Sequence, residues 1–141
     1  MVMPKPKAAE FETAGEQQIR ASLNLHWAAS ASGDLQAEHD IYDSEVICDY
    51  PQSGERIHGR PNLQALRGQH PAKPSGFAVL RLQGHVNLWV TEYIITYTGG
   101  PVYTVSIMEF RKGKVAHETQ YFAGPFEAPP WRAQWVERTR K

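Results

Sequence analysis

Two hydrophobic periods divide the chain into a largely helical first part and a β-rich second part. Up to about residue 67, apolar side chains recur mainly every three or four residues, which is the spacing of one helix face. From Ser75 onward the period changes to two, and β-branched and aromatic residues become frequent, as in strands with one buried face. The pattern predicts helices first and a sheet after them.

Three helices are predicted from local start and stop signals. Thr13 and Glu16 have the spacing of a capping box, Gly33 is a typical helix terminator, and Asp34 can cap a second helix at once. Pro61 suits the first turn of a third helix. The expected stripes are Ile19, Leu23, His26, Trp27 and Ser30 in the first helix, Leu35, His39 and Tyr42 in the second, and Leu63, Leu66 and Arg67 in the third.

The strands are predicted from β-branched and aromatic runs between turn residues. Val46-Ile47 leads into a turn marked by Pro51, and Gly59 ends a short polar strand after it. Gly99-Gly100 and Lys112-Gly113 are hairpin signals. Four longer strands are expected at 77–82, 86–97, 102–110 and 115–122. The fold class is therefore α+β: one curved antiparallel sheet with helices on one face.

One domain accounts for the length of 141 residues. Residues 1–12 are expected to form a flexible N-terminal arm and 13–124 the domain itself. Residues 125–141 form a Pro/Trp-rich extension of the same domain, in which Trp131 and Trp135 are four positions apart.

Composition excludes several classes of function. Lys plus Arg equals Asp plus Glu at 15 each, so no broad field attracts nucleic acid or an acidic membrane. Cys48 is the only cysteine, which rules out an internal disulfide and the common zinc frameworks. The six histidines lack paired ligand spacing, and no phosphate-binding loop is present, so neither metal nor cofactor is expected. No secretory signal or membrane span is visible, and a cytoplasmic protein is expected.

Several motifs together resemble the NTF2-like superfamily, in particular its SnoaL-like branch. The resemblance spans residues 16–123, and the segment 125–132 continues as in uncharacterised bacterial members. It implies a cone-shaped α+β barrel, in which the sheet wraps on three N-terminal helices and leaves a pocket at its wide end. The matching residues are Trp27 with 32–35, the segment 41–46, Pro51 with Gly59-Arg60, and Gly113-Lys114-Val115 followed by Tyr121-Phe122.

The strand register decides which side chains line such a pocket. Two-residue turns at both hairpins would place Glu92 opposite Ile107, and Ile107 opposite Glu118. A bulge in either hairpin would reverse this assignment. The face expected to line the pocket holds Val90, Glu92, Ile94, Tyr103, Val105, Ile107, Glu118, Gln120 and Phe122, and the other holds Trp89, Tyr93, Tyr97, Ser106, Met108, His117 and Tyr121.

Glu118 is the expected general base, with Glu92 nearby to raise its pKa. The resemblance to ketosteroid isomerases implies that Glu118, Gln120 and Phe122 line the cavity. It places His26 where those enzymes hold a tyrosine that stabilises an enolate oxygen. His39 is a second donor, and Gln120 orients the ligand. The alternative is that the carboxylates lie at a solvated rim, paired with Arg56 or Arg81, and that His26 is a core histidine bound to a carbonyl.

Five further residues complete the expected ligand contacts: Tyr42, Tyr50, Arg56, Tyr103 and Phe122. Arg56 is either an anion clamp at the mouth or a rim partner of Glu55. The isomerases carry an aspartate directly before the connector proline, where this chain has Tyr50, and Asp49 should face the opposite side of the strand. Ala123 stands where polyketide cyclases carry an acid. Neither steroid isomerisation nor polyketide cyclisation is therefore expected of this chain.

Two functions remain open at the level of sequence. The first is a small-molecule-binding homodimer, paired through its sheet, that performs cofactor-free acid–base chemistry (isomerase, dehydratase, cyclase or epoxide hydrolase type) on an apolar or aromatic metabolite. The second is a non-catalytic dimeric binding or assembly module, favoured by the aromatic residues Trp89, Tyr93, Tyr97 and Tyr121 if they are exposed. A cone filled by its own aromatic side chains would favour the module.

Overall fold

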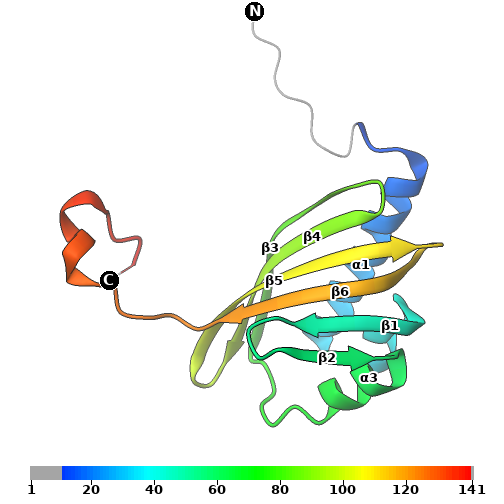
Figure 1. Ribbon diagram of the computed structural model, residues 1–141, viewed down its shortest axis with the longest axis horizontal. Helices are drawn as coiled ribbons and strands as arrows, with labels where there is room; N and C mark the ends of the chain where they lie inside the picture. The colour runs from blue at the N-terminus through cyan, green and yellow to red at the C-terminus, as the bar shows by residue number, and fades with distance from the viewer. Residues whose placement is uncertain (1–10, 141) are drawn as a thin grey trace, which may run out of the picture.

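Six strands form one curved sheet in the computed structural model, which describes residues 11–140 (Figure 1). The spatial order is β2-β1-β6-β5-β4-β3. The strands are β1 (Tyr42–Tyr50), β2 (Glu55–His58), β3 (Gly76–His85), β4 (Leu88–Tyr97), β5 (Gly100–Arg111) and β6 (Lys114–Ala123). All neighbours are antiparallel except β1 and β6, which run parallel. The sheet is therefore mixed and not wholly antiparallel as predicted, because no hairpin joins β1 to β6 and forces their directions to alternate.

Local capping signals start the helices where the sequence predicts them, but the second helix ends at His39, and Tyr42, which was expected on its stripe, begins β1 instead. In α1 (Ala14–Ser32), the Glu16 backbone N–H donates to the Thr13 hydroxyl, and the Glu16 carboxylate accepts from the Thr13 backbone N–H. Gly33 ends α1 at φ 78°, a left-handed conformation that glycine adopts without strain. The Asp34 side chain caps α2 (Leu35–His39), and Gly59 precedes α3 (Arg60–Gly68).

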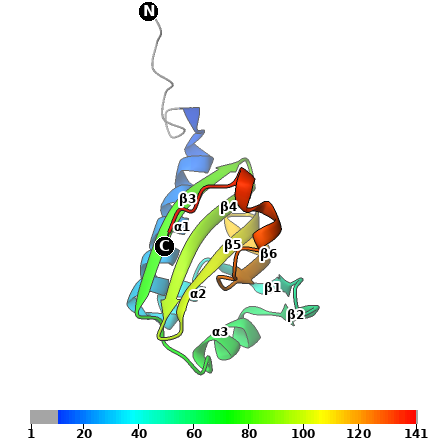
Figure 2. The ribbon, with the colours of Figure 1, turned by 90° about the vertical axis from the view of Figure 1, so that its left-hand side faces the viewer.

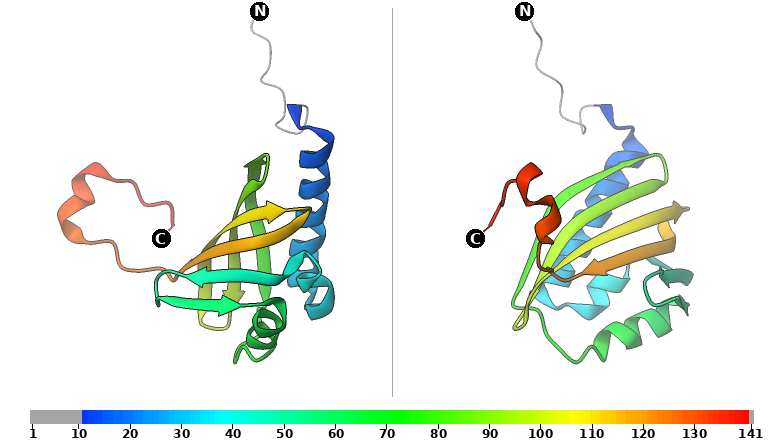
Figure 3. Two further views of the ribbon diagram at one scale, coloured as in Figure 1. Left: turned by 45° about the vertical axis from the view of Figure 1, so that its right-hand side comes forward. Right: turned by 60° about the vertical axis from the view of Figure 1, so that its left-hand side comes forward.

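The helices lie on one side of the sheet, and the C-terminal segment extends away from it. Figure 2 shows α1 beside β3 and α3 below β1 and β2, in agreement with their contacts. A short 3₁₀ helix, η2 (Pro130–Trp135), follows β6. Figure 3 (left) shows η2 on the side of β3 and β4 opposite α1.

Aromatic rings fill the space between α1 and the sheet. Trp27 stacks on Phe77 at 5.7 Å between ring centroids and lies 4.4 Å from Tyr93. The Trp27 indole N–H donates to the Thr91 hydroxyl. Trp89 is 1% exposed, and Arg20 lies over its ring. The interior of the cone is thus largely occupied by the protein's own side chains.

The predicted register is wrong on β4 and β5. Lys112-Gly113 forms a two-residue turn as predicted, but a bulge at Ala116 in β6, opposite the step from Glu109 to Phe110, places Met108, rather than Ile107, opposite Glu118. The turn between β4 and β5 comes one residue earlier than predicted, so Glu92 pairs with Val105. The inner face consequently carries Trp89, Tyr93, Ser106, Met108, Glu118, Gln120 and Phe122, and the outer face carries Val90, Glu92, Ile94, Tyr103, Val105 and Ile107.

The predicted N-terminal arm, residues 1–12, lies almost wholly outside the described residues. None of the helices within residues 11–140 has the length and apolar character needed to cross a membrane.

Candidate functional site

A buried polar cluster surrounds the guanidinium of Arg67, and we call it the Arg67 cluster. Its members are Arg67, Glu118, Tyr42, Gln120 and His39. Arg67 Nη2 donates to Glu118 Oε1 at 3.0 Å and to Gln120 Oε1 at 3.0 Å. Arg67 Nη1 donates to the Tyr42 hydroxyl at 2.8 Å, and that hydroxyl donates to Glu118 Oε1 at 2.6 Å. Arg67, Tyr42 and Glu118 thus form a closed hydrogen-bonded ring around an ion pair.

Three separate elements bring these side chains together. Gly59 and Pro61 start α3, and Arg67 lies one helical turn after the fully buried Leu63, so its side chain enters the interior. Glu118 and Gln120 alternate with outward residues on β6 and therefore share its inner face. Tyr42 begins β1, the parallel neighbour of β6.

The amide of Gln120 extends the cluster across the sheet to β4 and β5. Its Nε2 donates to the Tyr93 hydroxyl at 2.8 Å and to the Ser106 hydroxyl at 3.0 Å, and these two hydroxyls lie 2.9 Å apart. Tyr93 and Ser106 are both buried. One hydrogen-bonded chain therefore runs from Arg67 through Gln120 to the far strands.

One carboxylate oxygen of Glu118 has no partner. Oε1 accepts from Arg67 and Tyr42, whereas Oε2 is fully buried and makes no hydrogen bond within residues 11–140. Leaving a buried acceptor unsatisfied costs about 1–3 kcal/mol, more for a charged group. Such an atom is a candidate binding point for a ligand donor or for a proton.

Two buried histidines flank the cluster as neutral rings. His26 lies within 2.6 Å of the Glu38 carbonyl and His39 within 2.7 Å of the Leu35 carbonyl, in both cases through Nδ1. A carbonyl accepts, so Nδ1 carries the proton and Nε2 is left as an acceptor. Burial lowers the pKa of His26 to about 4, against the opposing charge of Glu118, and burial also lowers the pKa of His39.

Burial keeps the other weak acids of the site protonated. It raises the pKa of Tyr42 well above its ordinary value and that of Cys48 to about 12. Burial works against the charge of Arg67, but attraction to Tyr42 and Glu118 outweighs it and holds the pKa of Arg67 well above its usual range. A protonated Cys48 is not a nucleophile. The site therefore offers a fixed cation, a carboxylate oxygen and neutral donors.

Tyr50 and Phe122 lie at the ends of β1 and β6, beside the cluster. Their rings meet edge to face at 5.4 Å. Burial raises the pKa of Tyr50, and the nearby Arg67 partly offsets the rise. The Arg67 side chain itself is 15% exposed, which makes it the solvent-accessible edge of the ion pair.

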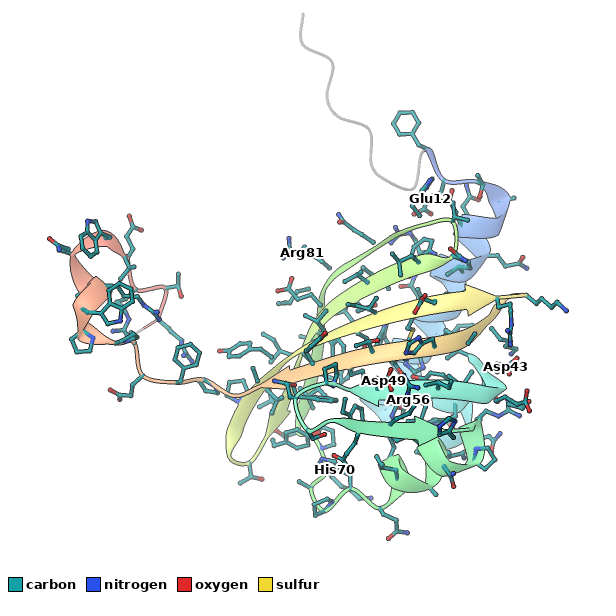
Figure 4. All side chains as sticks on the ribbon, viewed as in Figure 1. Glu12, Asp43, Asp49, Arg56, His70 and Arg81 are labelled. Atoms are coloured by element: carbon teal, nitrogen blue, oxygen red, sulfur yellow. The ribbon has the colours of Figure 1, made fainter. Side chains whose placement is uncertain are left out.

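Three predicted site residues lie elsewhere. Glu92 is on the outer face and accepts from Arg81 at 2.7 Å, so the prediction that it shares a face with Glu118 is wrong. Tyr103 is also on the outer face, 38% exposed. Arg56 donates twice to Asp49, at 2.7 and 3.0 Å, and Figure 4 shows these two side chains close together on β1 and β2.

Of the predicted residues, the structure gathers Glu118, Gln120, Tyr42, His26 and His39, with Tyr50 and Phe122 next to them.

Asp49 and His117 belong to a separate outer cluster. His117 Nε2 lies 2.8 Å from Asp49 Oδ2, and its Nδ1 lies 3.1 Å from Glu109. Hydrogen bonding from Arg56 is the main cause that lowers the pKa of Asp49 to about 2. These contacts match the expectation that Asp49 and His117 face away from the pocket residues. No three or more His, Cys, Asp or Glu side chains within residues 11–140 are arranged to hold a metal ion.

Sequence reasoning missed the role of Arg67 at the centre of the site. A signal was present, because an arginine on the same helical stripe as Leu63 must carry its charge toward the interior and needs an acid there. Tyr93 and Ser106 were missed for a different reason, the bulge at Ala116 in β6.

Two hollows lie outside the Arg67 cluster. The larger, of about 750 Å³, is shallow and open on the outer face of β3, β4 and β5, and we call it the outer hollow; the smaller, of about 270 Å³, lies at the start of α1. The residues lining the outer hollow include Arg81, Gln83, Leu88, Val90, Glu92 and Val105.

Known structures resemble this chain over most of its length. An NTF-2-like protein of unknown function from Burkholderia xenovorans LB400 is 67% identical with a TM-score of 0.82, covering 91% of this chain and 100% of its own. A structure described as a "putative ketosteroid isomerase", from Kribbella flavida DSM 17836, is 22% identical with a TM-score of 0.80, covering 89% and 92%. An NTF2-like protein of unknown function from Mesorhizobium loti is 16% identical with a TM-score of 0.68, covering 80% and 97%.

The chain belongs to the NTF2-like family, because the Burkholderia relative shares two thirds of its residues over nearly the whole length. The matches below 25% identity support the fold alone. No protein-family model and no curated protein matches the chain. The SnoaL-like branch stays a prediction.

Proposed function

We propose that the Arg67 cluster binds a small apolar or aromatic compound bearing a carbonyl or hydroxyl oxygen and moves a proton on it without a cofactor. The observation that supports this most directly is the buried, unpartnered Oε2 of Glu118 beside a fixed cation. A carboxylate held through one oxygen keeps the lone pairs of the other for a substrate proton.

Each group has a defined part in this proton transfer. Glu118 Oε2 takes a proton from the carbon next to the carbonyl, and the C–H electron pair moves to form an enolate. The positive charge of Arg67 stabilises the negative oxygen, as a preorganised charge does in a water-poor site. The proton then returns from Glu118 to carbon. His26 can only accept a hydrogen bond from a ligand hydroxyl, through Nε2, since Nδ1 donates its proton to a carbonyl.

The test is exchange of carbon-bound hydrogen for deuterium. The wild-type chain is incubated in D₂O with 1-tetralone, an apolar aromatic ketone, and loss of the proton signal next to the carbonyl is followed by NMR. We expect exchange above the buffer rate, and a fall of about 100-fold or more in E118Q, which is the usual contribution of a general base. R56Q alters a charged residue outside the site and is the matched control.

Circular dichroism of each variant separates loss of chemistry from loss of fold. Equal exchange rates in folded E118Q and wild type would overturn the role of Glu118. Exchange no faster than buffer in the wild type would argue against proton transfer on ketones.

A second function, that of a non-catalytic binding or assembly module, is favoured by the filled interior. Trp27, Phe77 and Tyr93 occupy the cone that an enzyme of this shape would open to substrate. The aromatic residues first expected on the outer face give mixed support, because Trp89 and Tyr93 are buried while Tyr121 is 42% exposed.

A further inference from the structure

The segment after β6 exposes large aromatic side chains. Phe126 is 77% exposed, Trp131 73% and Trp135 71%. We call residues 124–140 the C-terminal arm. Isolated exposed apolar residues are ordinary in folded proteins, but three large aromatic side chains on one short segment mark an interaction site.

The arm is fixed at its root and stiff along its length. The Gln52 side chain donates to the backbone carbonyl of Phe122 and accepts from its backbone N–H, which ties the end of β6 to the turn between β1 and β2. Pro125, Pro129 and Pro130 then restrict φ and favour an extended path. Figures 1 and 3 show the arm directed away from the body. It does not fold its aromatic rings onto its own sheet.

The outer hollow lies on the same side of the sheet as the C-terminal arm, and it can receive aromatic side chains of the kind that the arm exposes. Leu88 and Val90, 48% and 39% exposed, provide apolar lining, and Arg81 offers a guanidinium that can lie over an indole ring. The volume of about 750 Å³ accommodates more than one aromatic side chain. The tip of the arm already reaches this face, since Arg140 donates to the Tyr103 hydroxyl at 3.2 Å.

We propose that two copies of the chain exchange C-terminal arms, so that Trp131 and Trp135 of each copy fill the outer hollow of the other. A two-fold axis makes the contact reciprocal, and the interface then closes at a dimer. Each buried aromatic side chain removes about 150–250 Å² from water, so the four tryptophans of two arms contribute about 600–1,000 Å² before the covered sheet is counted. The sheet surface that the tryptophans cover adds a comparable area, and the sum reaches the range of specific, stable interfaces, about 1,200–2,000 Å².

Sedimentation equilibrium across a dilution series tests the anchor residues. We expect the wild type to be a dimer and W131A/W135A to raise the dimer dissociation constant by about 100-fold or more, because buried tryptophans are frequent hot spots. F11A and L25A are matched controls, since both remove exposed apolar side chains far from the arm, 76% and 74% exposed, and should leave the constant unchanged. A monomeric wild type, or equal constants for wild type and W131A/W135A, overturns the proposal.

Disulfide cross-linking tests the exchange itself. A133C is placed between the two tryptophans of the arm, and Q83C in the lining of the outer hollow; both leave the apolar anchors in place. The two single variants are purified separately, mixed and oxidised. A covalent dimer in the mixture, absent from either variant alone, supports arm exchange, because a disulfide needs Cα atoms within about 7 Å. A cross-link found only within single chains of A133C/Q83C, or none at all, overturns it.

Discussion

At the scale of single residues, the ion pair between Arg67 and Glu118 is the costliest feature of the molecule to disturb. Glu118 is completely buried and the Arg67 side chain is only 15% exposed, so water can replace little of the lost interaction when either charge is removed. Arg67 without Glu118 would keep Tyr42, Gln120 and a 3.4 Å contact with His39, whereas Glu118 without Arg67 would keep the Tyr42 hydroxyl and a 3.9 Å contact with the Cys48 thiol. Each residue of the pair therefore needs the other for the fold to stay stable, although the two lie 51 positions apart in the sequence.

We expect R67M and E118Q each to lower the free energy of unfolding by about 3–5 kcal/mol, the usual cost of breaking a buried pair. The apolar double variant R67M/E118L should lose less than the sum of the two by about 2 kcal/mol or more, because no uncompensated charge remains. Urea unfolding of all three measures this. R56M, which breaks an exposed pair, is the control, and strict additivity would contradict the interpretation.

At the scale of elements, the hairpin of β3 and β4 is closed by the packing of Trp89 on Gly84. The two residues are directly paired, and a Cβ atom placed on Gly84 would lie 2.1 Å from the Trp89 ring. The absence of a side chain at Gly84 lets the indole lie flat and fully buried against the strand.

G84A should therefore lower the free energy of unfolding by about 1–3 kcal/mol through overpacking. The matched control is G124A, where a new Cβ meets no atom within 4 Å and φ is not in the left-handed region. Thermal unfolding followed by Trp fluorescence compares the two. Equal midpoints for G84A and G124A would show that the ring moves aside without cost.

At the scale of the whole molecule, burial of a neutral His26 makes folding depend on pH. Its pKa is about 4 in the folded chain and about 6.5 when exposed, so between these values the unfolded chain binds the proton more readily. The contribution of His26 to stability is complete above about pH 6.5 and is lost as the pH falls toward about 4.

Urea unfolding should accordingly show the wild type losing about 2 kcal/mol of stability through His26 between about pH 7.5 and pH 5. H26Q should lose correspondingly less over the same interval, while H58Q, changed at an exposed strand position, should behave as the wild type. A His26 ring that titrates near pH 6.5 by NMR in the folded chain would contradict this expectation.

The sequence by itself determined the elements whose signals are local. The capping box of Thr13 and Glu16, the left-handed Gly33 and the Lys112-Gly113 turn each act within a few residues, and all three occur as predicted. The motifs also predicted membership of the NTF2-like family, which the similarity to the Burkholderia protein confirms. Glu118, Gln120, His26 and His39 are buried, as the resemblance and their spacing from such signals implied.

Only the tertiary structure decided how distant segments meet. One extra residue in β6, Ala116, opposite the step from Glu109 to Phe110, exchanged the faces of β4 and β5 relative to Glu118, and so moved Glu92 outward and brought Tyr93 inward. The parallel pairing of β1 with β6 and the meeting of Arg67 with Glu118 join segments far apart in sequence. Such contacts depend on register and packing summed over the whole chain, and a single-residue shift reverses them while every local signal stays the same.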